Sequence, residues 1–211
     1  MLNTGSLRIG GRKQLLAEDV YQYIGRAILD GDLQPRERIR DVELAQRLHV
    51  SRMPVREALQ RLERIGLVRM YPSRYTEVSA VSPATIAASL EFAAFQSGVV
   101  AHLAAARMDE AQRATASDMI DEIIAAFDDP AESSKRRSGL FEHLSMCTDN
   151  FLQRSLMEEA SLALTRNLQG MVIPPEQRDH VSARWETLRT ALAAGDPAAA
   201  ERAARAVHGR E

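Results

Sequence analysis

Hydrophobic residues recur at helical spacing along the first third of the chain. Over residues 14–30 they fall on one side of a helical wheel, which predicts a helix that ends at Gly31. Two more helices are expected over 41–48 and 52–65, and Val42 is expected on the inward face of the first of these. The pattern therefore predicts three helices close together near the start of the chain.

Two short strands are predicted directly after these helices. Residues 67–70 and 76–80 contain β-branched and apolar residues, and a polar turn that includes Pro72 separates them. A helix-turn-helix followed by a small hairpin is the element order of a winged helix-turn-helix. The first part of the chain is therefore expected to adopt that fold.

The rest of the chain shows helical patterning and no strand pattern. Proline, glycine, aspartate and asparagine interrupt it and predict six helices: 84–107, 109–127, 133–148, 150–169, 176–194 and 197–208. The fold class is thus mainly α. We expect a winged helix-turn-helix domain over 1–80, a linker over 81–83 and an all-helical bundle over 84–211.

The charges differ between these two parts. Residues 1–80 carry 14 Lys and Arg against 10 Asp and Glu, a net +4, whereas residues 81–211 carry 13 against 19, a net −6. A basic first part and an acidic second part suggest that a polyanion contacts the first part only. A solvated surface of mixed charge is the alternative explanation.

Several classes of protein are not expected. The single cysteine, Cys147, excludes an intrachain disulfide, and residues 1–11 contain no apolar run typical of a signal peptide or a membrane span. We therefore expect a cytoplasmic protein without a membrane partner. No nucleotide-binding loop, nucleophile motif or suitably placed carboxylate pair is recognisable, so neither an enzyme nor a catalytic residue is expected.

The densest functional signal lies at the start of the third expected helix. Residues 44–64 have the spacing of a helix, a tight turn and a second helix. Ser51, Arg52, Met53 and Arg56 fall in the first turn and a half of that second helix, where recognition helices meet base edges. Arginine in that place can bond to guanine or pair with phosphate. The complete helix-turn-helix favours DNA contact over merely solvated arginines.

These residues resemble a known family. Residues 14–80 resemble the DNA-binding domain of the GntR family, most specifically in the segment VSRMPVREALQRLERIGLV. The resemblance implies that Ser51, Arg52, Met53 and Arg56 contact DNA and that Arg40 contacts its backbone. It also implies a homodimer that reads a palindromic operator, because two-fold protein symmetry matches two half-sites.

Three positions depart from the family pattern. Arg36, His49 and Tyr75 stand where the family usually has glycine. Tyr75 falls at the expected tip of the wing, where a Cβ atom limits close approach of the backbone to DNA. We expect Ser73 and Arg74 to touch phosphate there.

The helical part resembles the FCD ligand-binding domain found in the FadR-like branch of the family. Glu91, Asn150 followed by Leu152, and AGDPAAAERA at 194–203 carry this resemblance. Many such domains hold a divalent metal through one aspartate and three histidines, which the resemblance places at four positions of this chain. Those positions contain Arg137, Phe141, Trp185 and either Val207 or, with a shift of one residue, His208.

Arginine, phenylalanine and tryptophan do not supply metal ligands, so no metal and no other cofactor is expected. The same positions instead suggest an apolar effector pocket with a positive charge. Its candidate residues are Arg137, Phe141, Trp185 and Arg189, and its candidate ligand is a small organic, acidic effector. For Arg137 the alternative is a solvated charge run with its neighbours Lys135 and Arg136.

The sequence therefore predicts a ligand-responsive, DNA-binding transcription regulator, in the first instance a repressor, that acts as a homodimer. The alternative is a DNA-binding dimer whose helical domain only dimerises and has lost its effector site.

Overall fold

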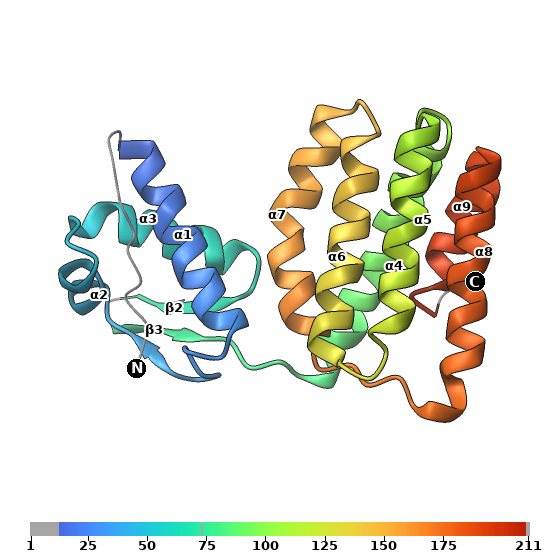
Figure 1. Ribbon diagram of the computed structural model, residues 1–211. Helices are drawn as coiled ribbons and strands as arrows, with labels where there is room; N and C mark the ends of the chain where they lie inside the picture. The colour runs from blue at the N-terminus through green and yellow to red at the C-terminus, as the bar shows by residue number, and fades with distance from the viewer. Residues whose placement is uncertain (1–12, 73, 210–211) are drawn as a thin grey trace. The chain divides into compact units, whose positions relative to one another are not determined.

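The computed structural model describes residues 13–72 and 74–209, and side chains from Leu16 onward. The chain divides into two compact units between Val81 and Ser82, within the expected linker (Figure 1).

The first unit contains three helices and a small antiparallel sheet. Its elements are α1 (Lys13–Leu29), β1 (Arg38–Ile39), α2 (Asp41–Arg47), α3 (Arg52–Arg64), β2 (Val68–Tyr71) and β3 (Tyr75–Val78). The strand order is β1-β3-β2, and Tyr71 pairs with Tyr75 at the closed end of the hairpin. The predicted winged helix-turn-helix order is confirmed. Strand β1 was not predicted, because two residues are too short to show an alternating pattern.

Helices α1 and α3 enclose the core of this unit. Val20 and Ile24 of α1 are fully buried, as are Leu59 and Leu62 of α3. Burying each such side chain stabilises the fold by about 1.5–3 kcal/mol. The expectation for Val42 was wrong, because 42% of its surface is exposed. Only part of the short helix α2 is covered.

The second unit is entirely helical over its described residues. Its helices are α4 (Pro83–Ala105), α5 (Glu110–Ala125), α6 (Pro130–Met146), α7 (Phe151–Leu168), α8 (Arg178–Ala194) and α9 (Pro197–Ala206), with a 3-10 turn at Pro175–Gln177. All six predicted helices are present, and their ends lie within three residues of the predicted ends. Local signals explain this agreement: Ser82, Asp109, Asn150 and Asp196 cap helix starts, and Gly195 ends α8 with a positive φ of 64°.

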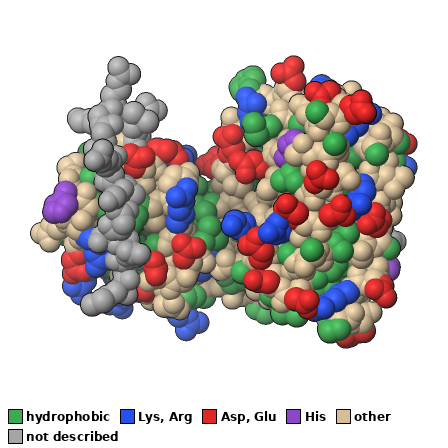
Figure 2. All heavy atoms as spheres, viewed as in Figure 1, with side chains coloured by type: hydrophobic (Ala, Val, Ile, Leu, Met, Phe, Trp, Pro, Cys, Tyr) green, Lys and Arg blue, Asp and Glu red, His purple; other side chains and the backbone are tan. Residues whose placement is uncertain are grey.

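Helix α4 packs against α6, α7, α8 and α9. Its buried alanines, such as Ala101 and Ala104, lie opposite the small residues of α9, such as Ala200 and Ala204. Small side chains let the two helices approach closely. By length and composition alone, α4 is also apolar enough to cross a membrane. Within the unit α4 contributes residues to the core, and 39% of its apolar stretch is buried. The outer face of the unit in view shows interspersed acidic and basic side chains (Figure 2).

Candidate functional site

The leading end of α3 faces solvent because its apolar residues occupy the opposite side. Pro54 and Val55 are buried, as are the residues one and two turns later. Ser51, Arg52 and Arg56 are exposed, and Met53 exposes 65% of its surface. The four predicted contact residues are therefore accessible together at one end of the helix.

Ser51 occupies the N-cap position of α3, as expected, with an extended backbone at φ −72° and ψ 164°. Its hydroxyl makes no capping bond to the helix. The first N–H groups of a helix and its positive dipole end favour an approaching anion. This end of α3 can therefore receive a phosphate as well as present side chains to bases.

A carboxylate from α2 lies beside the arginines of α3. One Nη atom of Arg52 donates to Oδ2 of Asp41 at 2.8 Å. This hydrogen bond holds the pKa of Asp41 below its usual range, and the charges of Arg52 and Arg56 act in the same direction. Arg52 is thus exposed but already engaged within the protein.

Arg40 has a similar local partner. It is the N-cap residue of α2, and its Nη1 donates to Oε1 of Glu43 at 2.8 Å, with both side chains well exposed. An exposed pair of this kind contributes only about 0.2–1 kcal/mol, so a phosphate can displace the carboxylate. Arg40 remains available for the predicted backbone contact.

The wing differs from its expected form. Ser73 lies outside the described residues, and Arg74 is exposed in the turn between β2 and β3. Tyr75 lies in β3 rather than in the turn, and its ring stacks on Tyr71 with 4.7 Å between centroids. The guanidinium of Arg38 lies 4.1 Å from the centroid of the Tyr75 ring. Tyr75 therefore stiffens the wing instead of bringing its backbone close to a ligand.

Two basic residues of the sheet were missed by the sequence reasoning. Arg38 on β1 and Arg69 on β2 both lie directly opposite Glu77 of β3 in the strand register. The three side chains therefore share one face of the sheet. The guanidinium of Arg69 also lies 5.6 Å from the Tyr71 ring centroid. The alternation of Arg69 and Tyr71 along β2 was a signal in the sequence. It could not be connected with Arg38, because strand β1 was not predicted.

The other two departures from glycine have a backbone consequence. Arg36 has a φ of 68° and His49 a φ of 55°, both in the left-handed region. A side chain in that region costs roughly 1 kcal/mol relative to glycine. Arg36 and His49 therefore adopt the left-handed backbone conformation that glycine would adopt more easily at these turns.

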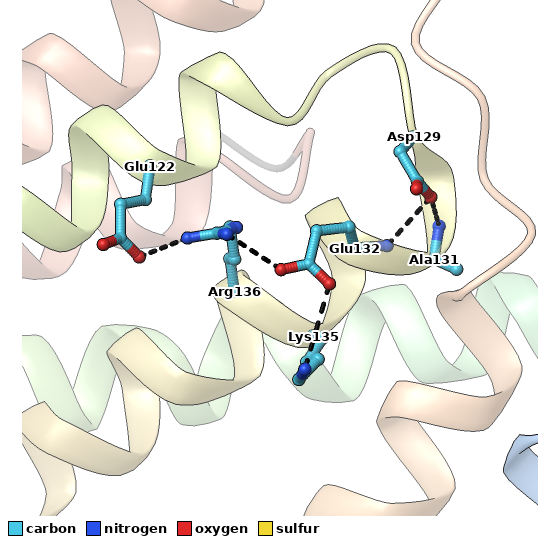
Figure 3. Close-up of polar contacts among 6 residues, drawn as sticks. All are labelled: Glu122, Asp129, Ala131, Glu132, Lys135 and Arg136. Atoms are coloured by element: carbon cyan, nitrogen blue, oxygen red, sulfur yellow. Dashed lines mark hydrogen bonds and ion pairs between the residues drawn. The ribbon is translucent and has the colours of Figure 1, made fainter.

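In the helical unit, Arg137 is separated from its charged neighbours. Arg136 pairs with Glu122 and Glu132, and Lys135 pairs with Glu132 at 3.9 Å, all at the surface (Figure 3). The side chain of Arg137 is half-buried, and desolvation by this burial lowers its pKa. Its Nε makes a long hydrogen bond of 3.4 Å to the carbonyl oxygen of Ser133, and no carboxylate among the described residues pairs with it. The three basic residues are not one solvated run.

Three rings converge beside Arg137. The Phe141 ring lies 6.4 Å from Trp185 and 5.5 Å from His208, measured between centroids. Both ring nitrogens of His208 are buried without a hydrogen-bond partner in the described structure. Burial and then the charge of Arg137 lower the pKa of His208 to about 4. Phe141 thus contacts both Trp185 and His208, the charge of Arg137 acts on His208, and Val207 lies in the same buried core as Phe141 and Trp185.

Arg189 is engaged elsewhere. Its guanidinium pairs with Asp121 of α5 and, at 3.4 Å, with Glu186 on its own helix. Those carboxylates satisfy its charge where α5 meets α8. Over the described residues, no group of three or more His, Cys, Asp or Glu side chains is arranged to hold a metal ion.

Comparison with known proteins matches each unit separately. Residues 16–78 match the family described as bacterial regulatory proteins, gntR family, and residues 98–209 match the FCD domain. An uncharacterized HTH-type transcriptional regulator of Agrobacterium vitis is 39% identical over 66 residues, which are 31% of this chain and 39% of that protein. The regulator YdhC of Bacillus subtilis is 41% identical over 49 residues, 23% of this chain and 22% of its own length. These matches thus span well under half of either relative.

Two solved structures share the fold across both units. McbR/YncC of E. coli aligns with a TM-score of 0.71 at 18% identity, covering 92% of this chain and 93% of its own. A putative transcriptional regulator GntR from Rhodococcus sp. RHA1 aligns with a TM-score of 0.66 at 23% identity, also covering 92% and 93%.

Proposed function

Since this chain belongs to the GntR family of DNA-binding transcription regulators and carries an FCD domain, we propose that it is a dimeric, effector-responsive repressor. Its first unit binds a palindromic operator, and its helical unit takes up a small organic acid that changes the affinity for that operator. Family and fold indicate a regulator rather than an enzyme. We place its action in the cytoplasm, where the operator DNA lies.

The observation that carries the DNA-binding role is the exposed leading end of α3. Arg52, Met53 and Arg56 lie there together, anchored by a buried apolar side. Recognition helices use these positions to read bases in the major groove. Arg40 and Arg74, which are exposed on α2 and in the wing turn, are assigned to the phosphate backbone, as is Ser73.

Operator binding can be tested without knowing the operator. Duplexes selected from a random-sequence library by the full chain should share a palindrome, and Arg56→Ala should weaken binding to it by about 1–3 kcal/mol. Arg64→Ala, at the opposite end of α3, is the matched control and should have little effect. Selection of no common motif would refute operator binding, and equal affinities of the two variants would remove Arg56 from the interface.

An apolar face on α4 supports the dimer. Phe92, Phe95 and Val99 recur at helical spacing and expose 43%, 53% and 44% of their surfaces. A second copy of the same face, related by a two-fold axis, would cover them. Light scattering should show a dimer for the full chain and a monomer for Val99→Asp. Leu156→Asp, on the exposed side of α7, is the control and should remain dimeric; the opposite result would move the interface to α7.

The interior cluster of the helical unit supports an acidic effector. The half-buried Arg137 has no carboxylate partner among the described residues, which is less favourable than a paired guanidinium, and an anionic ligand would offset that cost. Phe141 and Trp185 would contact the apolar body of the ligand, while Arg137 and an N–H of His208 would bind its carboxylate. Because Arg189 already has two partners, we place it at the margin of this site.

Thermal shift with small aromatic carboxylates, against their uncharged amides, tests this assignment. A carboxylate that binds should raise the melting temperature, since a ligand at about 100 times its Kd stabilises by about 2.7 kcal/mol. Arg137→Gln should abolish the shift and Arg136→Gln, one residue away at the surface, should retain it. An equal shift with the amides would contradict an anion site.

The second candidate is a helical unit that only dimerises. The residues at the positions where the resemblance places metal ligands favour it, because Arg137, Phe141 and Trp185 supply no such ligand. Operator affinity measured with and without a bound carboxylate separates the two candidates.

A further inference from the structure

An acidic side chain lies within the arginine-bearing surface proposed to read DNA. Asp41 is the first residue of α2, and Arg52, eleven residues later, is the first residue of α3. Their side chains meet at 2.8 Å, and Arg56, one turn along α3, also acts on the Asp41 carboxylate. Two arginines of the proposed contact surface thus lie beside one carboxylate.

This arrangement is unfavourable for affinity alone. A carboxylate near the DNA surface is repelled by phosphates, and it competes with them for the guanidinium that it holds. Asp41 is only partly covered, so removing its charge would leave no buried hole. Its position is more consistent with control of the arginine than with a role in the core.

The pairing restricts the ways in which Arg52 can be used. A free arginine carries about 2 kcal/mol of rotamer entropy and can follow any phosphate oxygen within reach. Asp41 engages one Nη atom of Arg52 and leaves its other N–H donors in a fixed direction. A pair of acceptors that matches this direction, such as the O6 and N7 atoms of guanine, can accept hydrogen bonds from two of the remaining N–H donors.

We propose that Asp41 is a positioning residue that determines specificity: it fixes the Arg52 guanidinium at the leading end of α3, so that Arg52 favours a base edge over the phosphate backbone. This inference rests on the proposed DNA-binding function. It assigns a selective role to a side chain of α2, and it predicts that losing this negative charge makes binding tighter and less discriminating.

The chain contains a matched control for the charge itself. Glu43 lies on the same short helix and pairs with Arg40 at the same distance, 2.8 Å, but away from α3. Removing either carboxylate relieves repulsion of phosphates. Only removal of Asp41 releases Arg52.

The test measures discrimination and affinity separately. Motifs are selected from a random-sequence duplex library with the full chain, and the base pair whose selectivity disappears in Arg52→Ala is identified. Affinities are then measured for the selected duplex, for the duplex changed at that base pair, and for a scrambled duplex. Asp41→Asn should reduce discrimination at that base pair by about two- to fivefold, the range of an exposed ion pair, while strengthening binding to scrambled DNA.

Three further variants make the result specific. Glu43→Gln should strengthen binding to scrambled DNA without reducing discrimination, and Asp41→Glu should retain much of the discrimination. In the Arg52→Ala background, Asp41→Asn should no longer change discrimination, because the two residues act as a unit. Circular dichroism of each variant verifies the fold.

Unchanged discrimination in a folded Asp41→Asn protein would overturn the inference, as would an equal loss in Glu43→Gln. If the unmodified chain selects no motif at all, the proposed DNA-binding function fails, and this inference fails with it.

Discussion

Arg40 and Arg52 of the first unit differ from Arg137 of the helical unit in their partners. In the first unit, Arg40 and Arg52 are exposed and each is held by a carboxylate at 2.8 Å. In the helical unit, Arg137 is half-buried and lacks a carboxylate partner among the described residues. Water screens the exposed pairs, so they are weak and a ligand can exchange them. Water screens the half-buried Arg137 less well, so its unpaired charge costs more free energy until an anion binds.

The largest expected difference between the units concerns one aromatic side chain in each. Trp185 is 1% exposed in the centre of the helical unit, whereas Tyr75 is partly exposed on the wing. Trp185→Ala should destabilise the helical unit by about 3–5 kcal/mol, because it leaves a cavity in the core. Tyr75→Ala should cost only about 1 kcal/mol, the value of a surface aromatic stack. Denaturant unfolding followed by circular dichroism measures both free energies of unfolding. Similar decreases in the two variants would contradict the expected difference between core and wing.

Acid should destabilise the helical unit through His208. Its pKa in the folded protein is lowered from 6.5 to about 4, so between these values the unfolded chain binds more protons. The free energy of unfolding is therefore highest above about pH 6.5, and it falls by about 3 kcal/mol as the pH decreases towards 4. Trp185 is the single tryptophan of the chain, so its fluorescence reports unfolding of this unit.

His208→Phe should remove most of that acid sensitivity while keeping the ring contact with Phe141. His49→Phe, at an exposed position in a turn of the first unit, is the control and should leave the tryptophan transition unchanged. An equally steep acid transition in His208→Phe would show that other groups cause it.

Removing the charge of Arg137 or of Arg52 should change the stability of the two units by different amounts. Arg137→Met should stabilise the helical unit by about 0.5–1 kcal/mol, because an apolar side chain replaces a half-buried, unpaired charge. Arg52→Met should change the stability of the first unit by less than about 0.5 kcal/mol, as surface substitutions usually do. Destabilisation by Arg137→Met would mean that the protein itself stabilises the charge of Arg137, which would contradict a role in binding an anionic ligand.

The smallest effect is expected at a turn of the first unit. His49→Gly should stabilise that unit by at most about 1 kcal/mol, because glycine relieves the positive φ of 55° but also gains freedom in the unfolded chain. Gly66→Ala, at a φ of 77°, is the reverse substitution and should destabilise it by a similar amount. Thermal unfolding compares the two, and a clear loss of stability in His49→Gly would indicate that the imidazole makes a contact of its own.

Local signals in the sequence determined the secondary structure and the exposed end of α3. Capping residues, glycine and proline act within a few positions of themselves, so nine helices were predicted with ends within three residues over the described chain. The amphipathic pattern of α3 likewise placed Arg52 and Arg56 opposite Val55 and Leu59. These features depend on residues that are neighbours along the chain.

Tertiary structure alone decided which side chains meet. Lys135, Arg136 and Arg137 are consecutive and look alike in sequence, yet only the first two pair with carboxylates among the described residues. Successive residues of a helix point roughly 100° apart, so the neighbouring helices decide which of them meets a partner. The short strand β1, the Asp41–Arg52 pair and the contact between Phe141 and His208 each join residues that are distant along the chain. Hydrophobic periodicity specifies the face of a helix, but the packing of whole helices determines what that face contacts.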